Sequence, residues 1–371
     1  MRQFKIFFLL LILSANFAPA VFAQDKNAED DDEVLRVETQ LVDVPVEITD
    51  RSGKPILNLK QSNFVVYEDG KRQELADFAA TSAPFEVALL LDTSGSARSE
   101  LPLITRAAEH FINSLRPGDR VSIISFRSDR EGGKAVAVSE VLTDLTDDRT
   151  KLKNVLKSVN VSNGTPYYDG LVQVVEQVFK EQPDEKFRGR RALVALTDGV
   201  DSTSAAGFEE VRERFGAAGI VSYFIQVDTR EFFEENLLGD CQSAMRFSAA
   251  QIRRYYRTFY PKSKIEKISS FCALGDFERL DISKSLYELA DKEMNLLAKT
   301  SGGKVFPVAD FSEARTAFAR VAQEIGTKYS LGYYPSNEKR DGSYRTIKVE
   351  LKGVPAGVTV RAREGYMAPK N

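Results

Sequence analysis

The chain has 371 residues, 43% of them hydrophobic and 28% charged, which is enough for one complete α/β domain and a smaller module. Its net charge of -3 and isoelectric point near 5.6 argue against general nucleic-acid binding, because that activity needs a basic surface. The chain has a single histidine, His110, which lies off the apolar stripe of its predicted helix and is therefore expected to be exposed. One histidine in such a position argues against a Ser-His-Asp hydrolase and against a zinc enzyme with histidine ligands.

Residues 1–23 have the layout of a signal peptide. Arg2 and Lys5 precede an apolar run, and Val21-Phe22-Ala23 offers a cleavage site with small residues at its first and third positions. An uncleaved membrane anchor is the alternative, but the apolar run is short for a membrane span. No cysteine follows the cleavage site, so we expect no lipid attachment and predict a secreted or periplasmic protein.

Three segments lie outside the centre of the chain. Residues 24–34 predict an acidic linker, because the five consecutive acids from Glu29 to Glu33 repel one another. Residues 35–82 show a strand pattern, in which apolar residues recur at alternate positions from Val42 to Ile48, and residues 327–371 return to such a pattern with glycine turns. The first of these β segments has too few strands to stand alone. We therefore predict that the two pair into one small β-sandwich with the α/β domain inserted between them.

Residues 83–326 alternate between strand and helix patterns. A continuous apolar run from Val87 to Leu91 is typical of a parallel strand covered on both faces, and an apolar stripe at helical spacing follows from Ile104 to Leu115. The other predicted strands are 121–126, 135–142, 192–196, 220–227 and 304–308, and the other predicted helices are 166–180, 208–218 and 312–325. This alternation predicts an α/β fold with a doubly wound, mostly parallel, Rossmann-like sheet and helices on both of its faces.

Residues 231–285 interrupt the alternation as an insertion that is too long for an ordinary loop, so they are either functional or partly disordered. They contain both cysteines, Cys241 and Cys272, which in an exported chain predict one disulfide; two reduced, buried cysteines are the alternative. They also contain a basic and aromatic patch from Arg253 to Lys264. The patch either binds an acidic partner or a phosphate surface, or is the solvated face of a helix with tyrosines packed beneath it.

Hydroxyl and carboxylate side chains stand at the ends of predicted elements in three places. Asp92, Ser94 and Ser96 follow the first strand of the α/β domain, Thr165 precedes a helix, and Asp198 ends a later strand. In a sheet of strand order 3-2-1-4-5-6 the first and fourth strands are neighbours, and ligands bind at their carboxyl ends. We therefore expect Asp92 and Asp198 to converge. Oxygen ligands of this kind suit a hard cation such as Mg²⁺.

Each of the three segments has a plainer interpretation when it is taken alone. The residues after Asp92 fit a turn or a helix N-cap, Thr165 followed by proline fits the start of a helix, and Asp198 followed by glycine fits a turn. Two further acids nearby, Asp169 and Asp201, are predicted to cap helices or to support the ligands through other groups. The occurrence of all three segments in this order favours the metal site.

The segments DTSGS, NGTPYYDGL and ALTDG resemble the three-part metal-ion-dependent adhesion site of von Willebrand factor A and integrin I domains. The flanking sequences LVDVPVEITDRSGKPILNL, FVVYEDGKRQ and RAREGYMAP look like a bacterial exported subfamily of A-domain proteins. The resemblance implies Mg²⁺ or Mn²⁺ held by the hydroxyls of Ser94, Ser96 and Thr165. It further implies that Asp92 and Asp198 act largely through water, and that a protein partner fills the open position with an acidic group.

These observations predict an exported, non-enzymatic binding or adhesion protein that takes a protein partner through a divalent cation. Nucleic-acid binding is not expected, and a membrane contact would come only through the partner. One alternative is an envelope scaffold without metal-dependent binding. The other is a Mg²⁺-dependent hydrolase, because a metal can generate a nucleophile without histidine, although no base is clearly aimed at a water.

Overall fold

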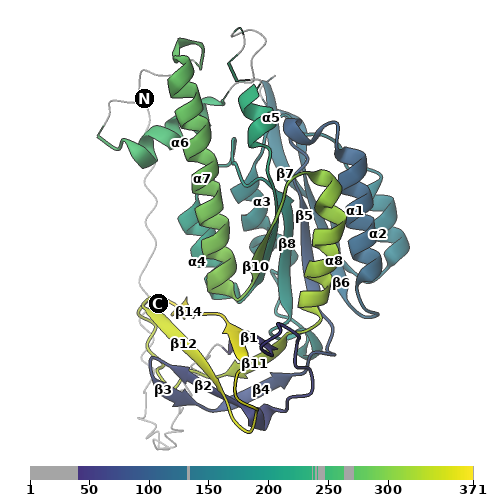
Figure 1. The fold of residues 1–371 in the computed structure, drawn as a ribbon, viewed down its shortest axis with the longest axis vertical. Coiled ribbons are helices and arrows are strands. Elements are labelled where there is room, and N and C mark those ends of the chain that lie inside the picture. The colour runs from purple at the N-terminus through teal and green to yellow at the C-terminus, as the bar shows by residue number, and fades with distance from the viewer. Residues whose placement is uncertain are drawn as a thin grey trace, which may run out of the picture. The chain divides into compact units, whose positions relative to one another are not determined.

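A six-stranded sheet forms the centre of the α/β domain (Figure 1). The computed structural model of the protein describes residues 41–131, 134–235, 237–238, 240, 247–262 and 271–370. The strands of this sheet are β5 (Glu86–Leu91), β6 (Arg120–Glu131), β7 (Lys134–Thr146), β8 (Arg191–Thr197), β9 (Val221–Val227) and β10 (Lys304–Val308). Their order is β10-β9-β8-β5-β6-β7, and all neighbours are parallel except β6 and β7. The predicted order is therefore confirmed, with β7 as the third strand along the chain.

Helices cover both faces of this sheet, as predicted (Figure 1). One face carries α1 (Leu101–Ser114), α2 (Arg149–Leu156) and α8 (Ala314–Ile325), and the other carries α3 (Tyr167–Gln173), α4 (Phe208–Ala218) and α7 (Asp276–Ser301). Successive residues of β5 enter opposite cores, because side chains alternate along a strand: Val87, Leu89 and Leu91 face α1, whereas Ala88 and Leu90 face α3. Every residue of β5 is buried, which explains its uninterrupted apolar pattern.

Strands from both ends of the described chain form the β-sandwich. One sheet has the order β13-β1-β11-β4 and the other β14-β12-β2-β3. Their strands are β1 (Val42–Thr49), β2 (Phe64–Glu68), β3 (Lys71–Gln73), β4 (Leu75–Ala79), β11 (Tyr329–Tyr333), β12 (Tyr344–Leu351), β13 (Thr359–Ala362) and β14 (Gly365–Met367). β1 pairs with β11 and β13, and β2 pairs with β12, all antiparallel. The predicted sandwich of N- and C-terminal segments is confirmed, whereas the domain limits 35–82, 83–326 and 327–371 stay predictions.

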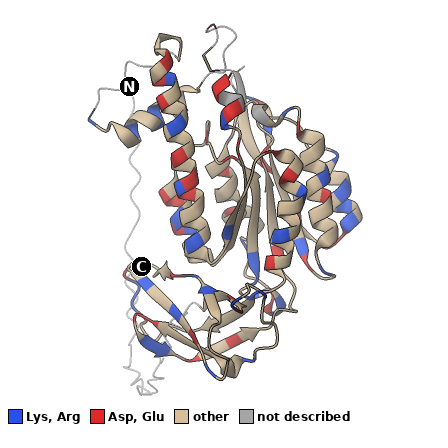
Figure 2. Cartoon of the chain, viewed as in Figure 1, with Lys and Arg blue, Asp and Glu red and all other residues tan. Residues whose placement is uncertain are grey.

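The crossover helix between β9 and β10 was not predicted. α7 runs from Asp276 to Ser301, so the last residues of the predicted insertion 231–285 belong to this helix. Ile282, Leu286, Ala290 and Met294 are buried at four-residue intervals on α7, which is helical spacing. Many acidic and basic residues lie between them, as Figure 2 shows along α7, and they obscured the pattern in the sequence.

The rest of the insertion contains α5 (Arg230–Glu235), α6 (Ala249–Phe259) and the 3-10 turn Phe271–Ala273. On α6 the side chains of Tyr255 and Tyr256 are buried, whereas Arg253 and Arg257 are exposed. These residues of the basic and aromatic patch fit the predicted solvated face of a helix over packed tyrosines, and binding of an acidic partner or a phosphate surface stays a prediction. Cys241 lies outside the described residues, as does Lys264, so the Cys241–Cys272 disulfide stays a prediction.

Several local boundaries differ from the predictions. The helix expected at 166–180 ends at Gln173 and continues as a π-helical turn, Val174–Val178. Short 3-10 turns occur at Gln61–Asn63, Glu185–Phe187 and Phe311–Glu313. The predicted signal peptide and acidic linker lie outside the described residues. None of the helices in the described ranges has the length and hydrophobicity of a membrane span.

Candidate metal centre

The ends of β5 and β8 bring Asp92 and Asp198 to one edge of the sheet. β5 ends at Leu91 and β8 at Thr197, and the two strands pair in parallel with Leu91 opposite Leu196. The Asp92 N–H donates to the Leu196 carbonyl at 2.9 Å, which continues the pairing one residue beyond β5. The predicted adjacency of these two strand ends is therefore confirmed, at the edge where doubly wound sheets bind ligands.

The Asp92 carboxylate is buried and hydrogen-bonded on both oxygens. Ser94 N–H donates to Oδ1 at 3.0 Å, Thr197 Oγ1 donates to Oδ2 at 2.7 Å, and the Ser94 hydroxyl also bonds this carboxylate. Burial raises the pKa of Asp92 in spite of these hydrogen bonds. Thr197 Oγ1 also accepts from Gly199 N–H at 2.9 Å, so one buried hydroxyl ties the Asp92 loop to the turn after β8.

Asp198 retains some solvent exposure and is also held on both oxygens. Val200 N–H donates to Oδ1 at 2.9 Å, and Thr229 Oγ1 donates to Oδ2 at 2.7 Å. Burial, and then the negative charge of Asp92, raise the pKa of Asp198 to about 7. A cation between two carboxylates that oppose each other's ionisation would stabilise both charged forms.

The loop that carries Thr165 meets the other two segments through its backbone. Ser162 N–H donates to the Thr93 carbonyl at 2.7 Å, beside Asp92. On its other side, Ser202 N–H donates to the Thr165 carbonyl at 3.0 Å, and Thr165 N–H donates to Ser202 Oγ at 2.7 Å. Thr165 is buried in this arrangement. The structure therefore brings together all three segments that the sequence singled out.

The helix-capping interpretation of Thr165 is wrong. α3 starts one residue later than predicted, so that Pro166 occupies the N-cap position. The cap is supplied from the neighbouring loop, where Asp201 Oδ1 accepts from Tyr167 N–H at 3.0 Å. Asp169 accepts two backbone N–H groups from the loop before α4. The structural roles predicted for both of these acids are therefore confirmed.

The two serines lie on the loop that follows β5. Ser94 is buried and directly precedes the 3-10 turn Gly95–Ala97, in which Ser96 is the central residue. The side chain of Ser96 lies outside the described part of the structure, so its place among the ligands stays a prediction.

Residues 87–200 match the family model described as von Willebrand factor type A domain, and this range includes all three segments. The chain contains a von Willebrand factor type A domain. No curated protein sequence matches the chain significantly.

The solved structures that are similar to this chain have low sequence identity with it. The BatB protein of Bacteroides thetaiotaomicron has 18% identity over 65% of this chain and 98% of its own, with a TM-score of 0.38. A von Willebrand factor type A structure from Catenulispora acidiphila has 12% identity over 90% of this chain and 75% of its own, with a TM-score of 0.42. Proximal thread matrix protein 1 from the mussel byssus, with a zinc-occupied MIDAS motif, has 15% identity, covers 70% of this chain and 49% of its own, and has a TM-score of 0.41.

The donor set at this edge of the A domain fits a hard divalent cation. Within the described ranges, no three His, Cys, Asp or Glu side chains gather as a metal cluster. A cation here would therefore depend on the two carboxylates of Asp92 and Asp198, together with hydroxyl oxygens. Such an oxygen set suits Mg²⁺ or Mn²⁺ rather than a metal that prefers thiolate ligands.

Three hydroxyl residues that support the carboxylates of the A domain were missed by sequence reasoning. Thr197 stands in the ALTDG segment directly before Asp198, so its position at the end of β8 was an available signal. Thr229 follows β9, and Tyr287 lies on α7, where its hydroxyl contacts Thr229 Oγ1 at 2.7 Å. No pattern in the sequence marks Thr229 or Tyr287, because only the fold brings these two residues close to Asp198.

Proposed function

We propose that this chain is a non-enzymatic binding protein whose A domain captures a protein partner through Mg²⁺ or Mn²⁺. The proposed ligands are Asp92, Ser94, Ser96, Thr165 and Asp198. The observation that carries the proposal is the meeting of two carboxylates at the carboxyl edge of β5 and β8, where burial raises the pKa of Asp92, and burial with the charge of Asp92 raises that of Asp198.

The proposed ligands from this chain leave the cation able to bind an anionic group of the partner. A bound divalent cation supplies a positive charge with positions left for an outside ligand. Asp92 already accepts hydrogen bonds from Thr197 and Ser94, and Asp198 from Val200 and Thr229, so part of the acceptor capacity of each carboxylate is used within the protein. The remaining proposed ligands are neutral hydroxyls. The partner is therefore proposed to contribute a carboxylate from an aspartate or a glutamate.

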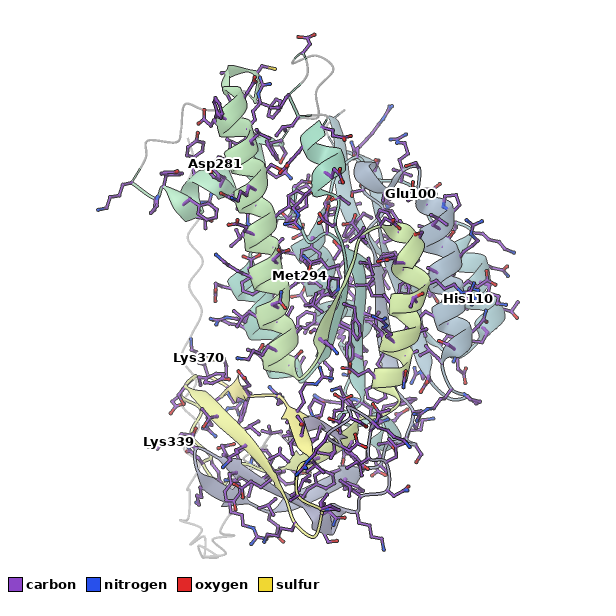
Figure 3. The ribbon with its side chains drawn as sticks, viewed as in Figure 1. Glu100, His110, Asp281, Met294, Lys339 and Lys370 are labelled. Atoms are coloured by element: carbon purple, nitrogen blue, oxygen red, sulfur yellow. The ribbon has the colours of Figure 1, made fainter. Side chains whose placement is uncertain are left out.

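Two features support a binding role over a catalytic one. His110 is exposed on α1, as predicted, and Figure 3 shows it on that helix. Beside the site, Asp169 accepts backbone N–H groups from the loop before α4, and Asp201 accepts the N–H of the first residue of α3, which gives both acids a structural role. Export is part of the proposal as well, and it rests on the signal-peptide pattern of residues 1–23.

The test is capture of partners from an envelope extract with the full mature chain as bait, in Mg²⁺ and in EDTA. We expect one set of proteins that is retained in Mg²⁺, lost in EDTA and lost with Asp92→Ala. Asp310→Ala is the matched control, because Asp310 is exposed and caps a short turn elsewhere, and it should leave capture unchanged. Capture that survives EDTA would support the scaffold, and turnover of a captured protein would support the hydrolase.

A further inference from the structure

Helix α7 packs directly against the turn that carries Asp198. Gly199 has a φ of +75°, and a Cβ atom placed on it would lie 2.8 Å from Met294 Cε and 3.4 Å from Ala290 Cβ. Both of these residues are on the buried face of α7, and Figure 3 shows Met294 on the side of the helix that faces the sheet. The backbone beside Asp198 therefore packs directly against the side chains of Met294 and Ala290 on α7.

A buried hydrogen-bond chain connects the same helix to the Asp198 carboxylate. The Tyr287 hydroxyl lies 2.7 Å from Thr229 Oγ1, which lies 2.7 Å from Asp198 Oδ2. Thr229 Oγ1 donates its one hydroxyl hydrogen to Asp198, so it accepts from Tyr287. Burial raises the pKa of Tyr287 well above its ordinary value, which keeps this phenol protonated as a donor. The direction of the chain is therefore fixed from α7 to Asp198.

α7 also holds the helix that follows Thr165. The Tyr168 hydroxyl on α3 donates to Glu293 on α7, and Arg254 on α6 donates to the same Glu293 oxygen, Oε2, at 2.7 Å. The Arg254 guanidinium lies over the Tyr168 ring, 4.7 Å from its centroid. Two of the three segments of the metal centre thus depend on contacts with one helix.

We infer that Tyr287 and Thr229 are positioning residues for Asp198, and that α7 thereby sets the affinity of the A domain for its cation. This inference rests on the proposed function, since it concerns the same site. Tyr287 acts through Thr229: it polarises and orients the Thr229 hydroxyl, which holds one oxygen of Asp198 in place. Loss of the Thr229 hydroxyl removes the hydrogen bond on Asp198 Oδ2 and leaves the one from Val200 N–H on Oδ1.

Calorimetric titration of Mg²⁺ and Mn²⁺ into the full mature chain tests the inference. Tyr287→Phe keeps the ring and should weaken ion binding about threefold to tenfold, and Thr229→Val should weaken it about tenfold. Thr229→Ser keeps the hydroxyl and should stay within about twofold of wild type. The double variant Tyr287→Phe/Thr229→Val should bind no more weakly than Thr229→Val alone, because Tyr287 acts only through Thr229. Unchanged affinity in Tyr287→Phe, or additive losses in the double variant, would overturn the inference.

A measurement without ions separates this inference from the proposed function. If the wild-type chain binds no ion, the proposed function fails, and the hydrogen-bond chain is then judged from urea unfolding of the ion-free protein. Tyr287→Phe should lower the unfolding midpoint more in the wild-type background than in the Asp198→Ala background, since the chain ends at Asp198. Equal shifts in the two backgrounds would show that Tyr287 does not act on Asp198, and the positioning role would be rejected.

Discussion

Replacement of Thr197 by valine should destabilise the metal centre without changing the shape of β8. Thr197 is 1% exposed, and its Oγ1 donates to Asp92 Oδ2 at 2.7 Å while accepting from Gly199 N–H at 2.9 Å. A hydrogen bond to a charged group contributes about 1.5–3 kcal/mol, and a buried N–H left without a partner costs about 1–3 kcal/mol. Because the two losses share one atom and do not simply add, we expect the free energy of unfolding to fall by about 3 kcal/mol.

The assay for Thr197→Val is urea unfolding of the ion-free chain, followed by circular dichroism, with ion titration as a second readout. Thr197→Ser is the matched control, because it keeps the hydroxyl and removes one methyl group, at a cost of about 1 kcal/mol. Ion affinity should fall in the valine variant and persist in the serine variant. A valine variant as stable as wild type, or a serine variant as destabilised as the valine variant, would refute the role given to this hydroxyl.

Three other substitutions test separate parts of the structure. Asp43 on β1 has an Oδ1 atom that is buried without a hydrogen-bond partner among the described residues, and burial raises its pKa from 3.8 to about 6. Burial of the charged carboxylate therefore lowers the stability of the folded chain above about pH 6, and it has no effect below about pH 4, where the carboxyl is protonated in both states. Asp43→Asn should add about 1–3 kcal/mol to the free energy of unfolding at pH 7.5 and nothing below pH 4. A gain in urea unfolding that does not change with pH would contradict this. Gly199→Ala should destabilise the chain by about 1–3 kcal/mol, because alanine is strained at a φ of +75° and its Cβ would displace Met294; an unchanged midpoint of thermal unfolding would count against it. Thr165→Ala should weaken ion binding but change stability by less than about 0.5 kcal/mol, since this residue does not cap α3, and a loss near 1 kcal/mol would show that its hydroxyl has a structural role after all.

The sheet and the edge that carries the site were predictable from sequence. β5 is buried on both faces, so its apolar run is unbroken, and the strand order of a doubly wound sheet then requires its end to lie beside the end of β8. The meeting of Asp92 and Asp198 follows from that order alone. The sandwich was predictable for a related reason, because strands such as β1 alternate and need a partner to cover their apolar face.

What surrounds the carboxylates was not predictable. Thr229 and Tyr287 are 58 residues apart and share no periodic pattern, so only the packing of α7 on the sheet brings their hydroxyls together. α7 itself was missed because its narrow buried face is interspersed with charged residues. The start of α3 was misplaced by one residue because its cap comes from Asp201 in another loop, and a local sequence window does not contain that contact.

The central claim is that the A domain holds a divalent cation at Asp92, and calorimetric titration of Mg²⁺ and Mn²⁺ into wild type and Asp92→Ala tests it most directly. The account predicts saturable binding of at least one of these ions to the wild-type chain. It also predicts loss of that binding in Asp92→Ala, with the circular dichroism spectrum unchanged. Equal ion affinity in the two proteins, or no binding to wild type, would contradict the account.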